Sequence, residues 1–383
     1  MLRCQREKFL LQRKTAYINC AYMSPIPKKV EKAGIRGIKA KRKPHLLPQE
    51  SFFKDSSTAR KLFADLINCN EPNRVVIMPS VSYGIATIIK NLKRKKGNVV
   101  LTARQFPSNV YGWKTLEKEG VTLRLIERPM SEQAGEDWNE EILNAITDDT
   151  IAVTIGNVHW ADGTIFDLEA IRRKTLSHGS LLIIDGTQSI GALPFDLQSV
   201  KADAVITAAY KWMMGPYGLT FGYFGAYFDH GIPLEDNWIN RKGSEDFSSL
   251  IEYSDEYREG SLRYEMGERS NFALLPMGIE GIKLVRHWQP SEVQSYCDQL
   301  LKAHADEIKE LGFDFDTGKY QSKHLLGIQC PDHLDVMNLK KSLKRNRVSI
   351  SIRGTKLRVS PNVYNDDRDI RKLLKSLRES FGN

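Results

Sequence analysis

The sequence has 383 residues, of which 41% are hydrophobic, and a formal net charge of +9; a chain of this length can bury one large core and a smaller one. No apolar run is long enough to span a bilayer, and the amino terminus lacks the apolar stretch of a signal peptide, so we expect a cytoplasmic protein that does not bind membranes. The five cysteines are scattered, without a CxxC or cysteine–histidine cluster, which supports neither a disulfide framework nor a metal site.

The amino-terminal part is basic. Residues 1–27 predict an arm with a short strand near 15–20 and a turn at 24–27, and residues 28–40 predict a basic amphipathic helix. Much of the positive charge lies between residues 28 and 43 and at 93–96. Because the first run contains no aromatic residues, we expect a solvated surface rather than a nucleic-acid site.

Strands and helices alternate through the middle of the chain. This alternation predicts an α/β fold, with a mostly parallel seven-stranded sheet and helices on both faces. The last strand follows a tight Gly-Pro-Tyr-Gly turn, too short for a crossover helix, so it should pair antiparallel. The expected strands are 75–78, 99–102, 122–126, 151–156, 181–185, 204–208 and 220–224, and the expected helices include 56–67, opened by Ser/Thr caps, 83–93 and 138–146.

The remainder predicts a second, smaller unit. Residues 229–270 have no clear period, and long irregular stretches inside a compact domain are usually functional. Helices are expected at 272–287 and 291–311, followed by a small α/β unit and a last helix at 367–380. We expect a large domain of residues 28–285 and a small domain that combines residues 1–27 with 286–383.

An acid and a lysine follow two neighbouring apolar runs. Leu181–Ile184 ends in Asp185, and Ala204–Ala209 leads into Tyr210 and Lys211. Ligands of parallel sheets bind beyond the carboxyl ends of the strands, so both side chains should lie at one edge. They form either a structural ion pair of little net stability or a pyridoxal phosphate (PLP) site. In such a site the lysine forms a Schiff base with PLP, and the acid pairs with the ring nitrogen.

The residues around this pair favour the second interpretation. They include Asp185-Gly-Thr-Gln188, the Gly-Ala-Leu-Pro link at 191–194, Tyr210-Lys211-Trp212 and Gly-Pro-Tyr-Gly at 215–218. This stretch resembles the class V aminotransferase group of fold-type I PLP enzymes, which includes cysteine desulfurases, kynureninases and isopenicillin N epimerase-like proteins. The resemblance covers most of the chain and implies the fold-type I architecture, with PLP as cofactor.

The resemblance also implies roles around the cofactor ring. Lys211 would hold PLP and then move protons at the substrate Cα, and Asp185 would keep the ring nitrogen protonated. Gln188 matches the position that hydrogen-bonds the ring hydroxyl. Phe106, in a Phe-Pro-Ser motif, would stack on the ring as in kynureninase-like members; core packing is the alternative.

The PLP phosphate needs a helix amino terminus, where free N–H groups favour an anion. Strand 75–78 runs into such a helix start, and the family position implies phosphate contacts from Val81 and Ser82. Tyr210 matches the kynureninase-like tyrosine that also reaches the phosphate, where desulfurases have histidine. Ser270 and Asn271 lie in a segment that resembles the one reaching the partner subunit's phosphate, which implies a homodimer.

An amino-acid substrate needs a carboxylate clamp, which an arginine supplies through its bidentate fork. Arg358, in the Lys-Leu-Arg-Val-Ser-Pro segment, matches the family's carboxylate arginine, and Arg353 is its rival near the same mouth. Trp160 follows the strand before Asp185 and should line the pocket. Three further residues are weaker candidates for which structural roles are favoured: His159, Asn19 and Met23.

These residues predict a homodimeric PLP-dependent aminotransferase acting on an L-amino acid through Lys211. The alternatives are a Cβ lyase (kynureninase-like, desulfurase-like or selenocysteine lyase-like), an isopenicillin N epimerase-like enzyme, or a non-catalytic binding module of the same fold. A desulfurase uses a cysteine shortly before the carboxylate arginine, yet residues 349–356 contain none and the nearest upstream is Cys330. We therefore expect that the protein is not a cysteine desulfurase.

Overall fold

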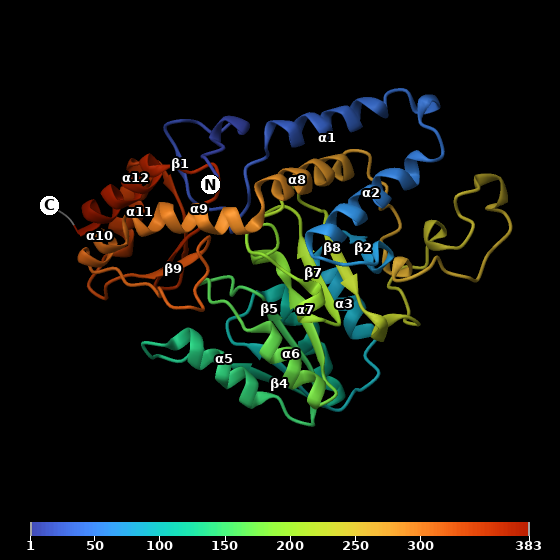
Figure 1. Ribbon diagram of the computed structural model, residues 1–383, viewed down its shortest axis with the longest axis horizontal. Coiled ribbons are helices and arrows are strands. Elements are labelled where there is room, and N and C mark those ends of the chain that lie inside the picture. Colours follow the sequence, from blue (N-terminus) through green and yellow to red (C-terminus); the bar gives the residue numbers. More distant parts are fainter. Residues whose placement is uncertain (1, 382–383) are drawn as a thin grey trace.

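A seven-stranded sheet forms the centre of the computed structural model, which describes residues 2–381 (Figure 1). The strand order is β2-β8-β7-β6-β5-β3-β4, and β8 is antiparallel to both of its neighbours, as the tight turn before it predicted. The remaining neighbours pair in parallel. The strands are β2 (Val75–Met78), β3 (Gly97–Thr102), β4 (Val121–Ile126), β5 (Thr150–Gly156), β6 (Leu181–Asp185), β7 (Ala204–Ala208) and β8 (Thr220–Phe224).

Both faces of this sheet are buried along β2, β5, β6 and β7 because these strands are continuous apolar runs, whereas the edge strand β4 contains Thr122 and Arg124 and is partly exposed. In β2, for example, Val75 and Ile77 pack into one hydrophobic cluster while Val76 and Met78 pack into another. The first cluster includes residues of α2, α5, α6 and α8, and the second includes residues of α3. The helices up to this point in the chain are α1 (Lys28–Ala40), α2 (Ser51–Leu66), α3 (Val81–Lys90), α4 (Tyr111–Lys114), α5 (Ala134–Ala145), α6 (Leu168–Ser177), α7 (Leu197–Val200) and α8 (Leu274–Trp288).

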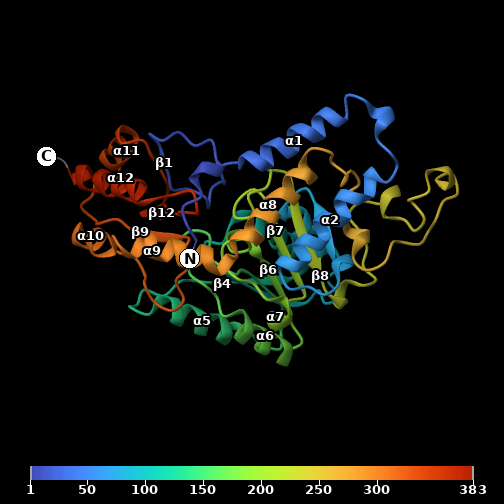
Figure 2. The same cartoon turned by 45° about the horizontal axis from the view of Figure 1, so that its top comes forward.

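The helix α1 lies alongside α8 in both views (Figures 1 and 2). The segment just before α8 approaches α1 closely at Gly37, where an added Cβ would lie 1.7 Å from the carbonyl oxygen of Phe272. Glycine is therefore required at this crossing. The segment between β8 and α8 contains short 3₁₀ helices and turns but neither α-helix nor strand, as its lack of a period predicted.

The carboxyl-terminal part has its own sheet and core. Its antiparallel sheet has the order β11-β12-β9, and residues such as Ile328, Leu339, Leu357 and Leu373 form a separate hydrophobic cluster. Gln289 has a φ of +61° and separates α8 from the next helix. The domain boundaries at residues 28 and 285 stay a prediction. The elements are α9 (Pro290–Lys302), α10 (Ala305–Glu310), β9 (Leu326–Gln329), α11 (Val336–Arg345), β10 (Val348–Ser349), β11 (Ser351–Arg353), β12 (Lys356–Val359) and α12 (Asp367–Arg378).

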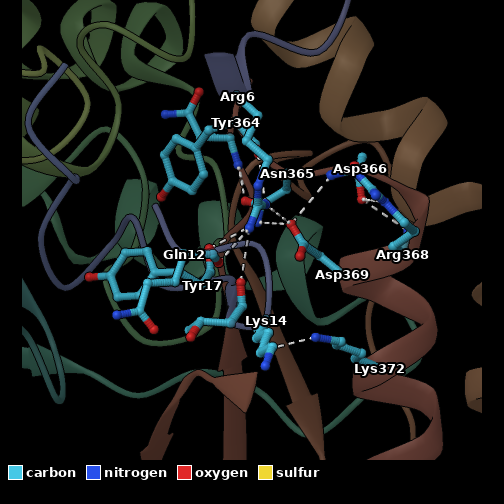
Figure 3. Close-up of polar contacts among 12 residues, drawn as sticks. Arg6, Gln12, Lys14, Tyr17, Tyr364, Asn365, Asp366, Arg368, Asp369 and Lys372 are labelled. Carbon is cyan, nitrogen blue, oxygen red and sulfur yellow. Dashed lines mark hydrogen bonds and ion pairs between the residues drawn. The ribbon is translucent and has the colours of Figure 1, made fainter. Parts of the chain in front are cut away.

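The amino-terminal arm is fastened to this second part (Figure 3). Its strand β1 (Ala16–Tyr17) pairs in parallel with β10. Arg6 donates to the carboxylate of Asp369 at 2.9 Å, and Asn365 donates to the Tyr17 carbonyl at 2.9 Å. The arm is thus bound to α12 and to the loop before it.

Some predicted helix boundaries were wrong. The helix expected at 56–67 begins at Ser51, and the Ser56 hydroxyl donates to the Phe53 carbonyl inside the helix instead of capping it. The helix expected at 83–93 begins at Val81, because the Ser80 side chain accepts from the Tyr83 N–H and caps it. The helix expected at 291–311 is two helices, α9 and α10.

No helix within residues 2–381 has the length and apolar character needed to cross a membrane. Within the same residues, no group of three or more His, Cys, Asp or Glu side chains could hold a metal ion.

Candidate active site

Asp185 and Lys211 lie at one edge of the sheet, as their strand-end positions predicted. Asp185 ends β6, and Lys211 follows β7, the neighbouring strand. Both side chains are buried, with 8% and 5% exposed. In the part of the chain that the structure describes, the Lys211 amine has no hydrogen bond or ion pair to any group. The two residues therefore do not form the structural ion pair that was the simpler interpretation.

Burial shifts the pKa of each group in the direction that favours its uncharged form. It lowers the pKa of the Lys211 amine to about 8, while the Asp185 carboxylate opposes that shift in part. Burial likewise raises the pKa of Asp185, against hydrogen bonds from Thr187. Desolvation disfavours each charged form. An amine with a pKa near 8 is partly neutral at physiological pH, which suits a nucleophile or a proton carrier.

Aromatic rings enclose the amine. The Lys211 Nζ atom lies 5.5 Å from the ring centroid of Phe106 and 5.4 Å from that of Tyr210. Phe106 meets Trp160 edge to face, with ring centroids 5.5 Å apart, and the Trp160 indole donates to the Arg104 carbonyl at 2.7 Å. The predicted pocket residues Phe106 and Trp160 are therefore brought together around Lys211.

Gln188 is held in place by residues that the sequence did not indicate. Its side-chain amide donates to the Ala21 carbonyl at 3.1 Å, and its side-chain oxygen accepts from the Trp212 indole at 2.9 Å. The His324 ring nitrogen Nε2 lies 2.7 Å from the Gln188 carbonyl, and its Nδ1 lies 2.6 Å from the Gln294 side chain. Burial lowers the pKa of His324 to about 4, so the ring is neutral. No motif marks His324, so only the folded structure reveals it.

The two candidate arginines flank the same indole. The guanidinium carbon of Arg353 lies 5.6 Å from the Trp160 ring centroid, and that of Arg358 lies 5.7 Å from it. Arg358 is buried and donates to the Trp160 carbonyl at 3.1 Å and to the Ser351 hydroxyl at 3.3 Å. Its buried Nε has no partner among the described residues, so the guanidinium keeps a free donor.

The start of α3 offers the other predicted contacts. Val81 is its first residue, and Ser82 shares a hydroxyl–hydroxyl hydrogen bond of 2.9 Å with the capping Ser80. The helix follows β2, which runs parallel to β7 because both pair antiparallel with β8. Its amino terminus therefore faces the same sheet edge as Lys211, with its first N–H groups free for an anion.

Ser270 and Asn271 are not brought to this site within one chain. The Ser270 hydroxyl donates to the Phe52 carbonyl, and the Asn271 side chain accepts from the N–H groups of Ala273 and Leu274 at the start of α8. No contact joins either residue to Lys211 in the described chain.

The weaker candidates have structural partners. His159 lies 3.0 Å from the Asp162 carboxylate and meets Trp138 edge to face. The side-chain oxygen of Asn19 accepts from the Ser351 hydroxyl at 2.9 Å. Because that hydroxyl accepts from Arg358, Asn19 supports Arg358 indirectly. Met23 contributes its backbone groups to hydrogen bonds with the arm.

A cleft of about 1450 Å³ opens next to these residues, with Trp160 and Arg353 in its wall. Lys211 and Asp185 lie outside its lining, and Trp160 connects the cleft to the site through its contact with Phe106. The cleft lies between residues around α5 and the hairpin β11–β12.

No thiol lines the approach before Arg358. Residues 349–356 form strand and hairpin without cysteine, and Cys330 is buried next to β9, where burial raises its pKa. Cys20 packs against the Lys211 carbonyl, 3.9 Å from its oxygen, and burial raises its pKa to about 12. Reactive cysteines need accessible thiolates, which neither residue offers.

Comparison with known proteins supplies a family. The sequence model of the family described as "Aminotransferase class-V" matches residues 39–383. An uncharacterised aminotransferase of Bacillus subtilis, YcbU, is 24% identical over 320 residues, which span 82% of this chain and 80% of that protein.

Solved structures share the whole fold. The apo structure of a cysteine desulfurase from Thermococcus onnurineus superposes with a TM-score of 0.83 at 18% identity and covers 100% of both chains. A variant of C-DES, solved with glycine covalently linked to its PLP cofactor, has a TM-score of 0.84 at 17% identity and covers 98% of this chain and 99% of its own. At such identities the likeness establishes the fold and leaves the reaction open.

Proposed function

Because this chain belongs to the aminotransferase class V family, whose enzymes are PLP-dependent, we propose that it is an aminotransferase acting on an L-amino acid, with Lys211 as the residue that binds the cofactor. The observation that carries this proposal is the buried Lys211 amine, which has no partner and a pKa of about 8. A buried amine without a partner is costly, and it fits a position that is covalently bound in the working enzyme.

The surrounding residues fit PLP. Asp185 would pair with the ring nitrogen, Phe106 would stack on one face of the ring, and Gln188 would hydrogen-bond the ring hydroxyl. Val81, Ser82 and Tyr210 would hold the phosphate at the start of α3. PLP supplies the electron sink that makes the substrate Cα acidic.

The remaining steps belong to the chain's own side chains. Arg358 orients the substrate carboxylate with the donors that its guanidinium keeps free, while the Trp160 carbonyl and the Ser351 hydroxyl accept from its two terminal nitrogens and hold the group in place. When its amine is free and neutral, Lys211 accepts a proton from the substrate Cα and then donates a proton to another atom of the reacting group. Phe106, Trp160 and Tyr210 exclude water from this transfer.

The proposal includes a homodimer. Ser270 contacts Phe52, and Asn271 contacts the start of α8. Within residues 2–381, neither residue contacts Lys211. A second subunit would give them the role that the sequence predicted, next to the partner's phosphate.

A Cβ lyase is the second candidate, since a cysteine desulfurase shares this fold. A lyase that transfers sulfur needs a reactive thiolate near the substrate. The buried thiols of Cys20 and Cys330 have raised pKa values, which argues against that route. We therefore rank transamination first.

The test uses the purified protein. It should be yellow, and borohydride should fix a phosphopyridoxyl group on Lys211, identified by mass spectrometry. A screen of amino acids should then yield keto acids from one of them, with sulfide and alanine assayed in parallel. A label on another lysine contradicts the site, and sulfide or alanine release without keto acid makes the lyase the correct activity.

A further inference from the structure

The region around Trp160 carries more positive charge than an ordinary amino-acid substrate neutralises. Arg353 and Arg358 lie within 5.7 Å of the same ring centroid, so their guanidinium carbons are at most twice that distance apart. Both cations also act on Lys211, and both lower its pKa after burial has done so. Three cationic groups therefore converge here, with Asp185 as their nearby carboxylate.

Among the residues that the structure describes, no carboxylate pairs with either arginine. The groups that act on the pKa of Arg358, besides burial, are Arg353, which lowers it, and the phenols of Tyr210 and Tyr17. Arg353 has no ion pair in the described chain; its guanidinium donates to the Ile352 carbonyl at 3.0 Å. Two like charges held close without an anion repel each other, unless a ligand supplies the missing negative charge.

Several acids of the adjoining cleft lie next to other bases. Asp316 pairs with Arg128 at 3.3 Å, and Asp162 lies 3.0 Å from His159. Glu127 lies 3.9 Å from Arg104 on the rim. Arg353 is a cation of this wall without an acidic partner among the described residues, so it is open to an anion brought by a ligand.

The cleft has room for a substrate with a long side chain. At about 1450 Å³ it is larger than the roughly 300–1,000 Å³ of common small-molecule pockets. Arg353 and Trp160 both line it, whereas the buried Arg358 does not. A group that extends from the substrate Cα into the cleft would therefore pass Arg353.

We propose that Arg353 binds a second anionic group, carried by the side chain of an acidic amino-acid substrate, while Arg358 binds its α-carboxylate. This inference rests on the proposed function and adds the substrate class. The recognised chemistry is an L-amino acid with a carboxylate or equivalent anion at the end of its side chain.

The test is calorimetry on the PLP-loaded enzyme with acids that lack an amine and cannot react. Succinate and glutarate should bind about ten- to hundredfold tighter than butyrate and valerate, the range expected for one added charged hydrogen-bonded contact. In Arg353→Gln the ratio of dicarboxylate to monocarboxylate affinity should fall close to one. In Arg353→Lys this ratio should be intermediate, because the charge remains but the fork is lost.

Arg104→Gln is the matched control, since it removes one positive charge from the cleft rim, where Arg104 is 87% exposed. It should retain the dicarboxylate preference, and circular dichroism should confirm that all variants are folded. Equal binding of mono- and dicarboxylates, or an equal loss in Arg104→Gln, overturns the inference.

The failures of the two proposals are distinguishable. A yellow enzyme that transaminates neutral amino acids without dicarboxylate preference contradicts the role of Arg353 and leaves the proposed function standing. A protein that takes up no PLP contradicts the proposed function itself.

Discussion

Replacing Lys211 with methionine should stabilise the cofactor-free protein at neutral pH. Methionine is also long and unbranched and fills the same buried position without a charge. Within residues 2–381 the amine makes no hydrogen bond that the substitution would break. What the substitution removes is the cost of keeping a buried cation next to the rings of Phe106 and Tyr210.

The size of this effect follows from the pKa of Lys211, which folding lowers from 10.5 to about 8. Each pKa unit corresponds to about 1.4 kcal/mol, so protonated Lys211 destabilises the folded protein by about 3 kcal/mol. Between these two pKa values the unfolded chain binds the proton and the folded chain does not. Stability therefore rises as the pH increases from 8 to 10.5, and the full cost is present below pH 8.

Urea unfolding of both proteins, freed of PLP, at pH 7 and at pH 10 measures this directly. At pH 7 Lys211→Met should be more stable than the wild type by about 3 kcal/mol, and most of that difference should disappear at pH 10. Taking the difference between the two proteins cancels the other titrating groups. A difference that does not change with pH would show that Lys211 keeps its ordinary pKa and refute the reasoning.

Three further predictions concern the same site. At pH 7 a pKa near 8 makes the neutral amine about 300-fold more abundant than a pKa of 10.5 would, so PLP uptake by the cofactor-free protein should level off near pH 8; a rate still rising steeply at pH 10 contradicts this. Arg358→Lys should raise KM for the amino-acid substrate about tenfold with PLP content preserved, because the fork is lost; an unchanged KM, with Arg353→Lys impaired instead, moves the α-carboxylate to Arg353. Cys330→Ser should leave any sulfide release from L-cysteine unchanged, since the thiol is buried, and loss of that release would show that Cys330 carries sulfur.

The sequence predicts the sheet well because buried parallel strands are written in continuous apolar runs. The bounds of β2, β6, β7 and β8 agree with those expected. The strand β3 starts earlier than expected, at Gly97, because the buried Asn98 side chain accepts from the Thr150 hydroxyl at 3.1 Å. Because both residues of this pair are polar, the start of the strand does not belong to the apolar run from which the strand was predicted.

The helix ends were harder to predict because tertiary contacts decide them. The run expected to be one helix breaks at His304, whose ring lies 2.8 Å from the Asp367 carboxylate. Neither glycine nor proline marks this break. The contact joins α10 to the distant start of α12, which no local pattern contains.

The same limit applies to the candidate site. The strand-end rule predicted that Asp185 and Lys211 lie at one edge of the sheet. It did not predict that they form no ion pair with each other. Gln188 could be named from its motif, whereas its partners Trp212 and Ala21 come from other parts of the chain. That Arg353 and Arg358 flank Trp160 depends on how the hairpin β11–β12 packs against the loop after β5.

The fastened amino-terminal arm has a consequence for how the protein forms during synthesis. Asn19 leaves the ribosome early, yet it accepts its hydrogen bond from Ser351, which lies 332 positions later. At about 5–20 residues per second, the arm waits roughly 15–70 s for this partner and for β10. The pairing of β1 with β10 therefore forms only after the central sheet has been translated, and the support that Asn19 and Ser351 give to Arg358 is completed only near the end of synthesis.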